Sequence, residues 1–120
     1  MRDSEKLYFD YQRIHVKGFQ RPLCDLFLIG SKGKIMLKAL IDSGADYSVF
    51  KIKDAEDAGV NIKDGEITHI QFGVLKSEGY RKKVYISLNG FLLRTDVVFV
   101  EHLSLPYVLL GRIGVFARFN

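Results

Sequence analysis

The amino-acid sequence predicts an all-β fold with one or two short helices. Several runs of residues alternate between apolar and polar side chains, which is the period of a half-buried strand. Turn signals separate these runs, and the dipeptide Asn89-Gly90 is the strongest of them. The chain has 120 residues, of which 48% are hydrophobic and 27% are charged, and such a composition is typical of a globular domain. We therefore expect a single domain over residues 1–120.

The first half of the chain predicts four strands. Apolar residues dominate residues 7–16, 23–29 and 35–41, and each of these runs is long enough for one strand. The sequence Gly30-Ser31-Lys32-Gly33 lies between the second and third runs and is typical of a hairpin turn. Residues 47–50 form a fourth, shorter apolar run.

A helix and two more strands are expected next. Residues 53–58 have a helical composition, and Gly59 follows at the position of a C-terminal helix stop. Residues 66–72 alternate as a strand does. The pattern is interrupted over residues 73–79, and the alternation returns over residues 80–88.

The C-terminal part predicts a hairpin and a short apolar segment. Asn89-Gly90 favours a type I′ turn, because both central residues of that turn take positive φ. Residues 91–100 are the expected partner strand. Residues 107–110 are apolar, and residues 112–119 are compatible with one or two helical turns.

The charge pattern favours a solvated surface over a nucleic-acid site. The formal net charge is +4, and the basic residues are scattered singly apart from Arg81-Lys82-Lys83. No aromatic residues are interleaved with them in the manner of a single-strand binding platform. We therefore expect no nucleic-acid partner, and a basic β-barrel that binds RNA is the weaker alternative.

No segment predicts a membrane span or a metal site. No apolar run approaches the ~20 residues that cross a bilayer. His15, His69 and His102 lie far apart and lack ligand partners at metal spacing. Cys24 is the only cysteine, so it has no partner for an intramolecular disulfide, and a reducing, cytoplasmic environment is expected. Since leucines flank Cys24, we expect a small buried hydrophobic residue rather than a nucleophile.

One polar segment stands out because an apolar strand runs directly into it. The predicted strand over residues 35–41 is followed by Asp42, then by Ser43 and Gly44, before apolar residues resume. Glycine permits a tight turn and a close approach that a Cβ atom would block. The tripeptide Asp-Ser-Gly is also common in ordinary β-turns. Taken alone, it fits both a turn and a catalytic loop.

The wider sequence resembles the retropepsin-like aspartic proteases. The family signature is an apolar strand that ends in Asp-Thr/Ser-Gly-Ala, and Leu40-Ile41-Asp42-Ser43-Gly44-Ala45-Asp46 matches it. A second family element, two apolar residues followed by Gly-Arg, is matched by Leu109-Leu110-Gly111-Arg112. The ending, residues 111–119, looks especially like that of the prokaryotic (bacterial and archaeal) members. The resemblance spans residues from about 7 to the end, and it implies a closed β-barrel with a flap hairpin.

The resemblance also implies a role for each matching residue in the first element. Asp42 corresponds to the catalytic aspartate. Ser43, Gly44 and Ala45 correspond to the residues that support it, with the Ser43 hydroxyl bracing two catalytic loops across a dimer axis. Serine stands here where threonine is commoner in the family, which keeps the hydroxyl and loses a packed methyl group.

Two further groups of residues follow from the same resemblance. Asp46 and Arg112 match a structural ion pair near the floor of the active site, and we expect this pair to be largely buried. Phe72, Gly73 and Val74 lie at the position of the substrate-covering flap.

The function that the resemblance implies is that of an aspartic endopeptidase. The chemistry needs two carboxylates, and one chain supplies one such aspartate, so a homodimer with a peptide or protein substrate is expected. No metal or organic cofactor is expected. Because the family usually continues into another strand where this sequence ends at Asn120, we expect a weak dimer. The alternative is a catalytically weak module that dimerises or binds peptides.

Overall fold

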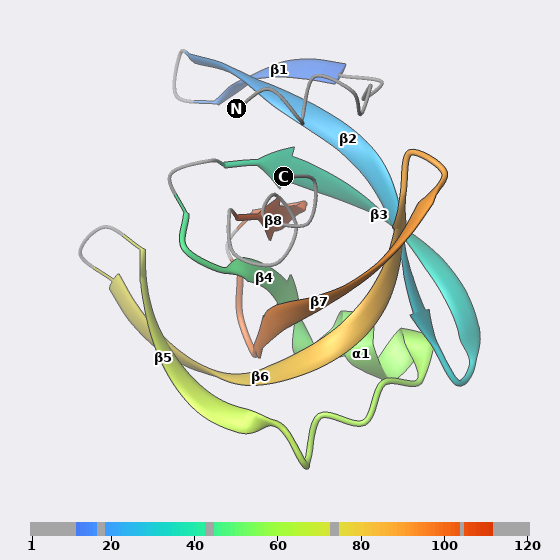
Figure 1. Cartoon of the computed structure of the whole chain (residues 1–120). Coiled ribbons are helices and arrows are strands. Elements are labelled where there is room, and N and C mark those ends of the chain that lie inside the picture. The colour runs from blue at the N-terminus through green and yellow to red at the C-terminus, as the bar shows by residue number, and fades with distance from the viewer. Residues whose placement is uncertain (1–11, 17–18, 43–44, 73–74, 104, 112–120) are drawn as a thin grey trace.

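Eight strands form one sheet that closes on itself. The structure, a computed structural model, describes residues 12–16, 19–42, 45–72, 75–103 and 105–111. The strands are β1 (Gln12–Val16), β2 (Phe19–Gly30), β3 (Gly33–Ile41), β4 (Ser48–Lys51), β5 (Glu66–Phe72), β6 (Leu75–Leu88), β7 (Phe91–Val100) and β8 (Val108–Leu110). Their order in the sheet is β1-β2-β3-β8-β4-β7-β6-β5, and β2 also pairs with β6. The six strands from β2 to β6 in this order therefore form a closed barrel, as Figure 1 shows.

The all-β barrel agrees with the expected fold class, and both predicted hairpin turns are confirmed. Gly30 pairs with Gly33 across the β2–β3 turn, and Leu88 pairs with Phe91 across the β6–β7 turn. In the second turn, Asn89 has a φ of 51° and Gly90 a φ of 84°. Positive φ at both positions is what a type I′ turn requires.

The sequence predicts that the strand pattern is interrupted over residues 73–79, and this prediction is wrong for residues 75–79. Strand β6 begins at Leu75 and continues to Leu88, because residues 75–81 pair with β5. Gly79 weakens the strand pattern in the sequence, but in the structure it pairs with Val100 of β7. A Cβ atom at Gly79 would come within 2.6 Å of the Phe99 carbonyl oxygen, so glycine is needed for the close packing of β6 against β7 there.

One short helix packs onto the barrel, close to where the sequence predicts it. Helix α1 (Ile52–Ala58) contacts β2, β3, β4 and β7. Its first turn is held by Asp54, whose Oδ2 accepts a hydrogen bond of 3.1 Å from the Lys51 N–H, and burial raises the pKa of the Asp54 carboxyl. Ala55 and Ala58 face inward and are fully buried. Residues 112–119, the other predicted helical segment, lie outside the described residues.

The inside of the barrel is filled by apolar side chains from every barrel strand and from α1. The Phe50 and Phe99 rings meet edge to face with centroids 5.9 Å apart, a favourable geometry for aromatic pairs. Around them pack Cys24, Leu26, Leu28, Ala39, Val84, Ile86, Leu88, Leu93, Val97, Val108 and Leu110. Packing of this core fixes the positions of the barrel strands, and therefore also of the polar residues that follow the strand ends.

A second apolar cluster covers the outer side of β3, β8, β4 and β7. Its buried members are Leu23, Leu40, Val49, Ile70, Val98, Val100 and Leu109. They alternate with residues of the barrel interior, so these strands are buried on both faces. Ile70 comes from β5, which means that the β5–β6 hairpin is anchored onto the strands that end next to Asp42.

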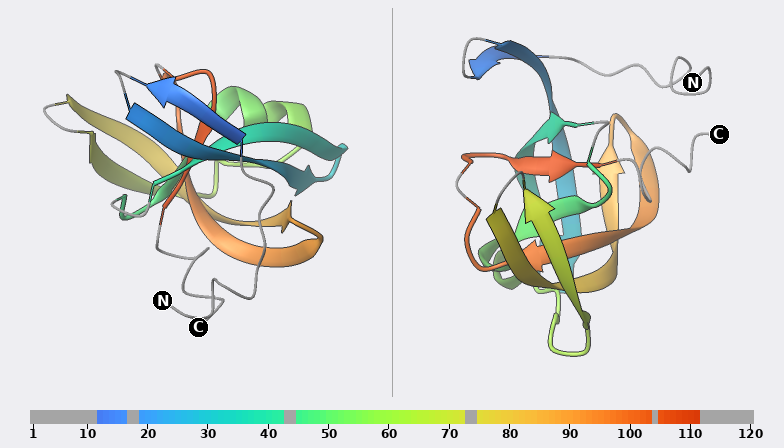
Figure 2. Two further views of the ribbon diagram at one scale, coloured as in Figure 1. Left: turned by 90° about the horizontal axis from the view of Figure 1, so that it is seen from above. Right: turned by 90° about the vertical axis from the view of Figure 1, so that its left-hand side faces the viewer.

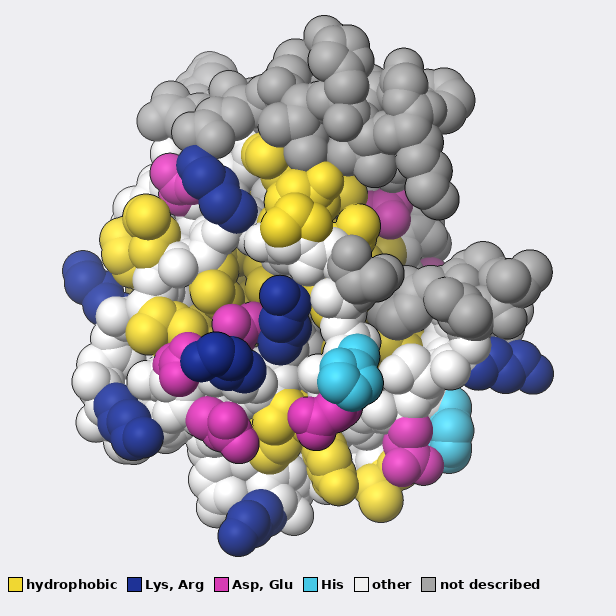
Figure 3. Space-filling view, turned by 180° about the vertical axis from the view of Figure 1, so that it is seen from behind, with side chains coloured by type: hydrophobic (Ala, Val, Ile, Leu, Met, Phe, Trp, Pro, Cys, Tyr) yellow, Lys and Arg dark blue, Asp and Glu magenta, His cyan; other side chains and the backbone are white. Residues whose placement is uncertain are grey.

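Among the described residues, the one helix is too short to cross a membrane. On the face shown in Figure 3, basic and acidic side chains are interspersed and do not form a large patch of one charge.

Candidate active site

Asp42 comes directly after β3, where β3 runs beside β8. The two strands are parallel, and Ile41 pairs with Leu110 at their carboxyl ends. The next backbone N–H, that of Asp42, donates a hydrogen bond of 3.0 Å to the Leu110 carbonyl oxygen. The two sequence elements that carry the family resemblance, far apart in the chain, are therefore adjacent in space.

One backbone hydrogen bond links Asp42 and Ala45, the two described residues that flank Ser43 and Gly44. The Ala45 N–H donates a hydrogen bond of 3.0 Å to the Asp42 carbonyl oxygen, which is the closure of a four-residue β-turn. Ser43 and Gly44, its two central residues, lie outside the described residues. The hydrogen bond between Ala45 and Asp42 is compatible with both interpretations of Asp-Ser-Gly, an ordinary turn and a catalytic loop.

The Asp42 loop joins β3 to β4, and a third strand lies between these two strands in the sheet. Strands β3 and β4 are consecutive in the chain, but β8 lies between them, parallel to β3 and antiparallel to β4. This arrangement ties both ends of the Asp42 loop to one short strand. The carboxylate therefore sits on a support that is held from two sides, as a catalytic group requires.

A buried serine that sequence reasoning missed strengthens this support. The Ser48 side chain is fully buried, and its Oγ accepts a hydrogen bond of 3.1 Å from the Gly111 N–H. A Cβ atom at Gly111 would lie 2.4 Å from the Tyr47 carbonyl oxygen and 2.8 Å from that of Ala45. The glycine of the second family element is thus required for close packing against the Asp42 loop. The signal in the sequence was a single serine within the apolar run 47–50.

The carboxyl-bearing residues of the loop differ in exposure. Asp42 is half-buried, whereas Asp46 is exposed in the single chain. The expectation that Asp46 is largely buried is therefore not met here, because Asp46 lies in a bend before β4 begins rather than in the strand. Arg112, its expected partner, lies outside the described residues, and their ion pair stays a prediction.

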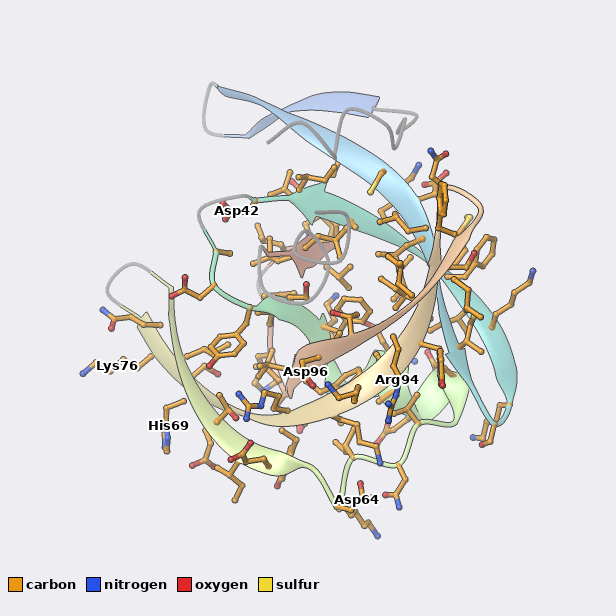
Figure 4. All side chains as sticks on the ribbon, in the orientation of Figure 1. Asp42, Asp64, His69, Lys76, Arg94 and Asp96 are labelled. Atoms are coloured by element: carbon orange, nitrogen blue, oxygen red, sulfur yellow. The ribbon has the colours of Figure 1, made fainter. Side chains whose placement is uncertain are left out.

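The β5–β6 hairpin extends toward the same side of the molecule as Asp42. Figure 4 places Asp42 beyond the end of β3, and Figures 1 and 2 show on that side the end of the hairpin at which β5 finishes and β6 begins. The last described pair before its tip is Phe72 with Leu75. Gly73 and Val74, which were expected to belong to the flap, lie outside the described residues. A hairpin thus occurs where the resemblance implies a flap.

One hollow among the described residues lies on the β5–β6 hairpin, and Asp42 does not line it. It has a volume of about 560 Å³ and is lined by residues of the β5–β6 hairpin, including His69, Gln71, Lys76 and Glu78. His69 and Glu78 are cross-strand partners with Nε2 and Oε2 3.2 Å apart, and both are exposed.

Other chemistries find little support among the described residues. No group of three or more His, Cys, Asp or Glu side chains is placed to hold a metal ion there. Cys24 is 3% exposed, and burial raises its pKa to about 12, so the thiol stays protonated near neutral pH. The expectation of a buried hydrophobic cysteine is confirmed.

The one basic cluster of the sequence is neutralised in the structure. Arg81 pairs with Glu66, Lys82 with Asp64, and Lys83 with Asp96. These pairs leave the cluster without the excess positive charge that attracts a phosphate backbone.

Comparisons with protein-family models and with curated proteins find no match for this chain.

Proposed function

We propose that this protein is an aspartic endopeptidase that works as a homodimer, with one Asp42 carboxylate from each chain. The observation that supports this most strongly is the placement of its two family-like elements. Asp42 and Leu110 belong to different elements, yet a backbone hydrogen bond joins them. A chance match of two short motifs would not require them to pair as neighbouring strands.

The chemistry needs two carboxylates that share one proton. Two such groups within ~3 Å of each other do not both ionise easily, so they titrate as a coupled pair. The ionised member accepts a proton from a water molecule, which attacks the scissile carbonyl carbon. The protonated member donates a hydrogen bond to the carbonyl oxygen and stabilises the tetrahedral intermediate. The amine then leaves with a proton from the pair.

A two-fold axis is the simplest source of the second carboxylate. A C2 interface brings identical residues of two chains together, and Asp42 is the one aspartate in this sequence with the strand-Asp-Ser-Gly-Ala context. Asp42 lies near the surface of the single chain, in a loop anchored on both sides by β8. A firmly held carboxylate near the surface is what such an interface requires.

The test is peptide cleavage by the wild-type chain and by Asp42→Asn. A mixed peptide library is incubated with each protein at several pH values between about 4 and 7, and products are identified by mass spectrometry. The amide is nearly isosteric with the carboxylate but does not accept the proton from water, so cleavage should be lost while the circular dichroism spectrum is unchanged. Asp64→Asn, at an exposed aspartate far from Asp42 (Figure 4), is the matched control and should cleave normally.

Two outcomes would contradict the proposal. Undiminished cleavage by Asp42→Asn would exclude the aspartic mechanism. Peptide binding by a wild-type dimer that cleaves none of the library would favour the alternative, a peptide-binding or dimerisation module.

A further inference from the structure

Exposed apolar side chains gather on the outer face of four neighbouring strands, β3, β2, β6 and β7. Met36, Phe27, Ser87 and Leu92 form one row across this face, because they pair in that order from strand to strand. Met36 is 60% exposed and Leu92 65%. Neighbouring large apolar residues in solvent are typical of an interaction site.

A second row lies next to the first and ends in a cation on each side. Its members are Lys34, Ile29, Tyr85 and Arg94, again in cross-strand order. Tyr85 is 49% exposed. We call the eight residues of these two rows the four-strand patch.

The two cations of the four-strand patch rest on aromatic rings. Lys34 Nζ lies 4.8 Å from the centroid of the Phe27 ring, and Arg94 Cζ lies 6.0 Å from that of Tyr85. None of the ion pairs between described residues includes Lys34 or Arg94. Both cations thus remain available to an anionic group that approaches the patch.

The carboxylates that border the patch are already engaged. Asp25 pairs with Lys38 at 2.8 Å, and Asp96 pairs with Lys83 at 3.3 Å. The patch therefore combines an apolar centre with two cations that no carboxylate of the described residues neutralises. Its complement is an apolar surface that carries negative charge.

We propose that the four-strand patch docks a segment of a partner protein in which apolar side chains are flanked by Asp or Glu. A second copy of this chain is less complementary, because its own patch would bring Lys34 and Arg94 against the same two cations. An anionic membrane is also less complementary. Recognition of anionic lipid typically uses about four to eight clustered basic residues, whereas the patch has two and is bordered by two aspartates.

The docking site is separate from the proposed active site. Met36 lies on β3, six residues before Asp42, or about 20 Å at the rise of an extended chain. Arg94 is also well separated from Asp42 in Figure 4. Loss of the Asp42 carboxylate should therefore leave docking unchanged, so the two proposals can fail independently.

The experiment selects ligands from a display library of random peptides of roughly 12 residues. The wild-type chain is the bait, and peptides that also bind Met36→Thr/Leu92→Thr are removed by counter-selection. The surviving peptides are synthesised, and their dissociation constants are measured by fluorescence anisotropy. The variants tested are Lys34→Glu/Arg94→Glu and the matched control Ile67→Thr/Lys63→Glu, which makes similar changes at exposed positions in and before β5.

The expected survivors contain apolar residues together with Asp or Glu. Their dissociation constants should rise about tenfold or more in the Lys34→Glu/Arg94→Glu variant, while the control and Asp42→Asn bind like the wild type. Circular dichroism should show that every variant is folded, since the substitutions are at exposed residues apart from the nearly isosteric Asp42→Asn.

Three results would overturn the proposal. The first is a selection without survivors, or survivors that lack acidic residues. The second is binding of the wild-type chain to phosphatidylserine vesicles that the patch variants lose, which would assign the surface to lipid. The third is self-association that only the patch variants lose, which would assign it to a second copy.

Discussion

The backbone N–H of Asp42 donates a hydrogen bond of 3.0 Å to the carbonyl oxygen of Leu110. This bond continues the parallel pairing of β3 with β8 by one residue beyond Ile41. The position of the Asp42 loop therefore depends on a strand from the far end of the chain. The loop is held by long-range structure rather than by its own turn alone.

Mixing of active and inactive chains should show whether two copies build one site. At constant total protein, wild-type chains are mixed with Asp42→Asn chains and the cleavage rate is measured. If both carboxylates are needed, the rate follows the square of the wild-type fraction, and an equal mixture retains about a quarter of the activity. Mixing with Asp64→Asn should leave the rate unchanged. A linear decrease to about half would indicate that each chain works alone.

Activity should be highest below neutral pH. The paired carboxylates must hold one shared proton, which they lose as pH rises, and both become protonated at low pH. A plot of kcat/KM against pH should therefore be bell-shaped. On its alkaline side, kcat/KM should have fallen to its minimum near neutral pH. Deprotonation of Cys24 contributes nothing in this range, because its pKa is raised to about 12. A rate that continued to increase from about pH 7 to 9 would contradict the shared-proton mechanism.

Ser48→Ala should destabilise the fold through the Asp42 loop. The buried Gly111 N–H would lose its acceptor, and a buried donor without a partner costs about 1–3 kcal/mol of unfolding free energy. Ser31→Ala is the control, because the exposed Ser31 hydroxyl bonds to the Gly59 carbonyl oxygen where water can replace it. Urea unfolding should show a clear loss for the first variant and little for the second. Equal losses would mean that Ser48 does not brace the loop.

The strand pattern of the fold could be predicted from the sequence because its signals are local. Residues 66–72 and 91–100 are strands over the predicted bounds, and Asn89-Gly90 forms the predicted turn. The start of β6 was missed because Gly79 breaks the alternation of apolar and polar residues. Glycine is needed there because the carbonyl oxygen of Phe99, on another strand, leaves no room for a Cβ atom.

The site was predictable to a lesser extent. The apolar strand before Asp42 and the motif at Leu109-Leu110-Gly111 are visible in the sequence, but their pairing is a long-range contact that periodicity does not encode. The role of Ser48 was missed for the same reason, since its partner Gly111 comes from the other end of the chain. The exposure of Asp46 was missed because a bend delays the start of β4.

Thr95→Val should stabilise the barrel. Thr95 is 2% exposed on β7, and its Oγ1 has no hydrogen-bond partner among the described residues. Replacing an unpaired buried hydroxyl with a methyl group of similar shape removes a desolvation penalty, so the unfolding free energy should increase by about 1 kcal/mol. In the control Thr68→Val, a hydroxyl bonded to the Glu66 carbonyl oxygen is lost, and no increase is expected. Thermal and urea unfolding would measure both, and destabilisation by Thr95→Val would show that its hydroxyl has a partner.

The separation of the two Asp42 carboxylates in a crystal structure of the protein tests the central claim most directly. Crystals would be grown with a peptide whose scissile bond is reduced, so that the substrate cleft is occupied and no cleavage occurs. The proposal predicts a two-fold axis at the Asp42 loops, with the two carboxylates about 3 Å apart and facing the reduced bond. Peptide-bound chains in which every Asp42 lies more than about 10 Å from any other carboxylate would contradict it, because no proton could then be shared.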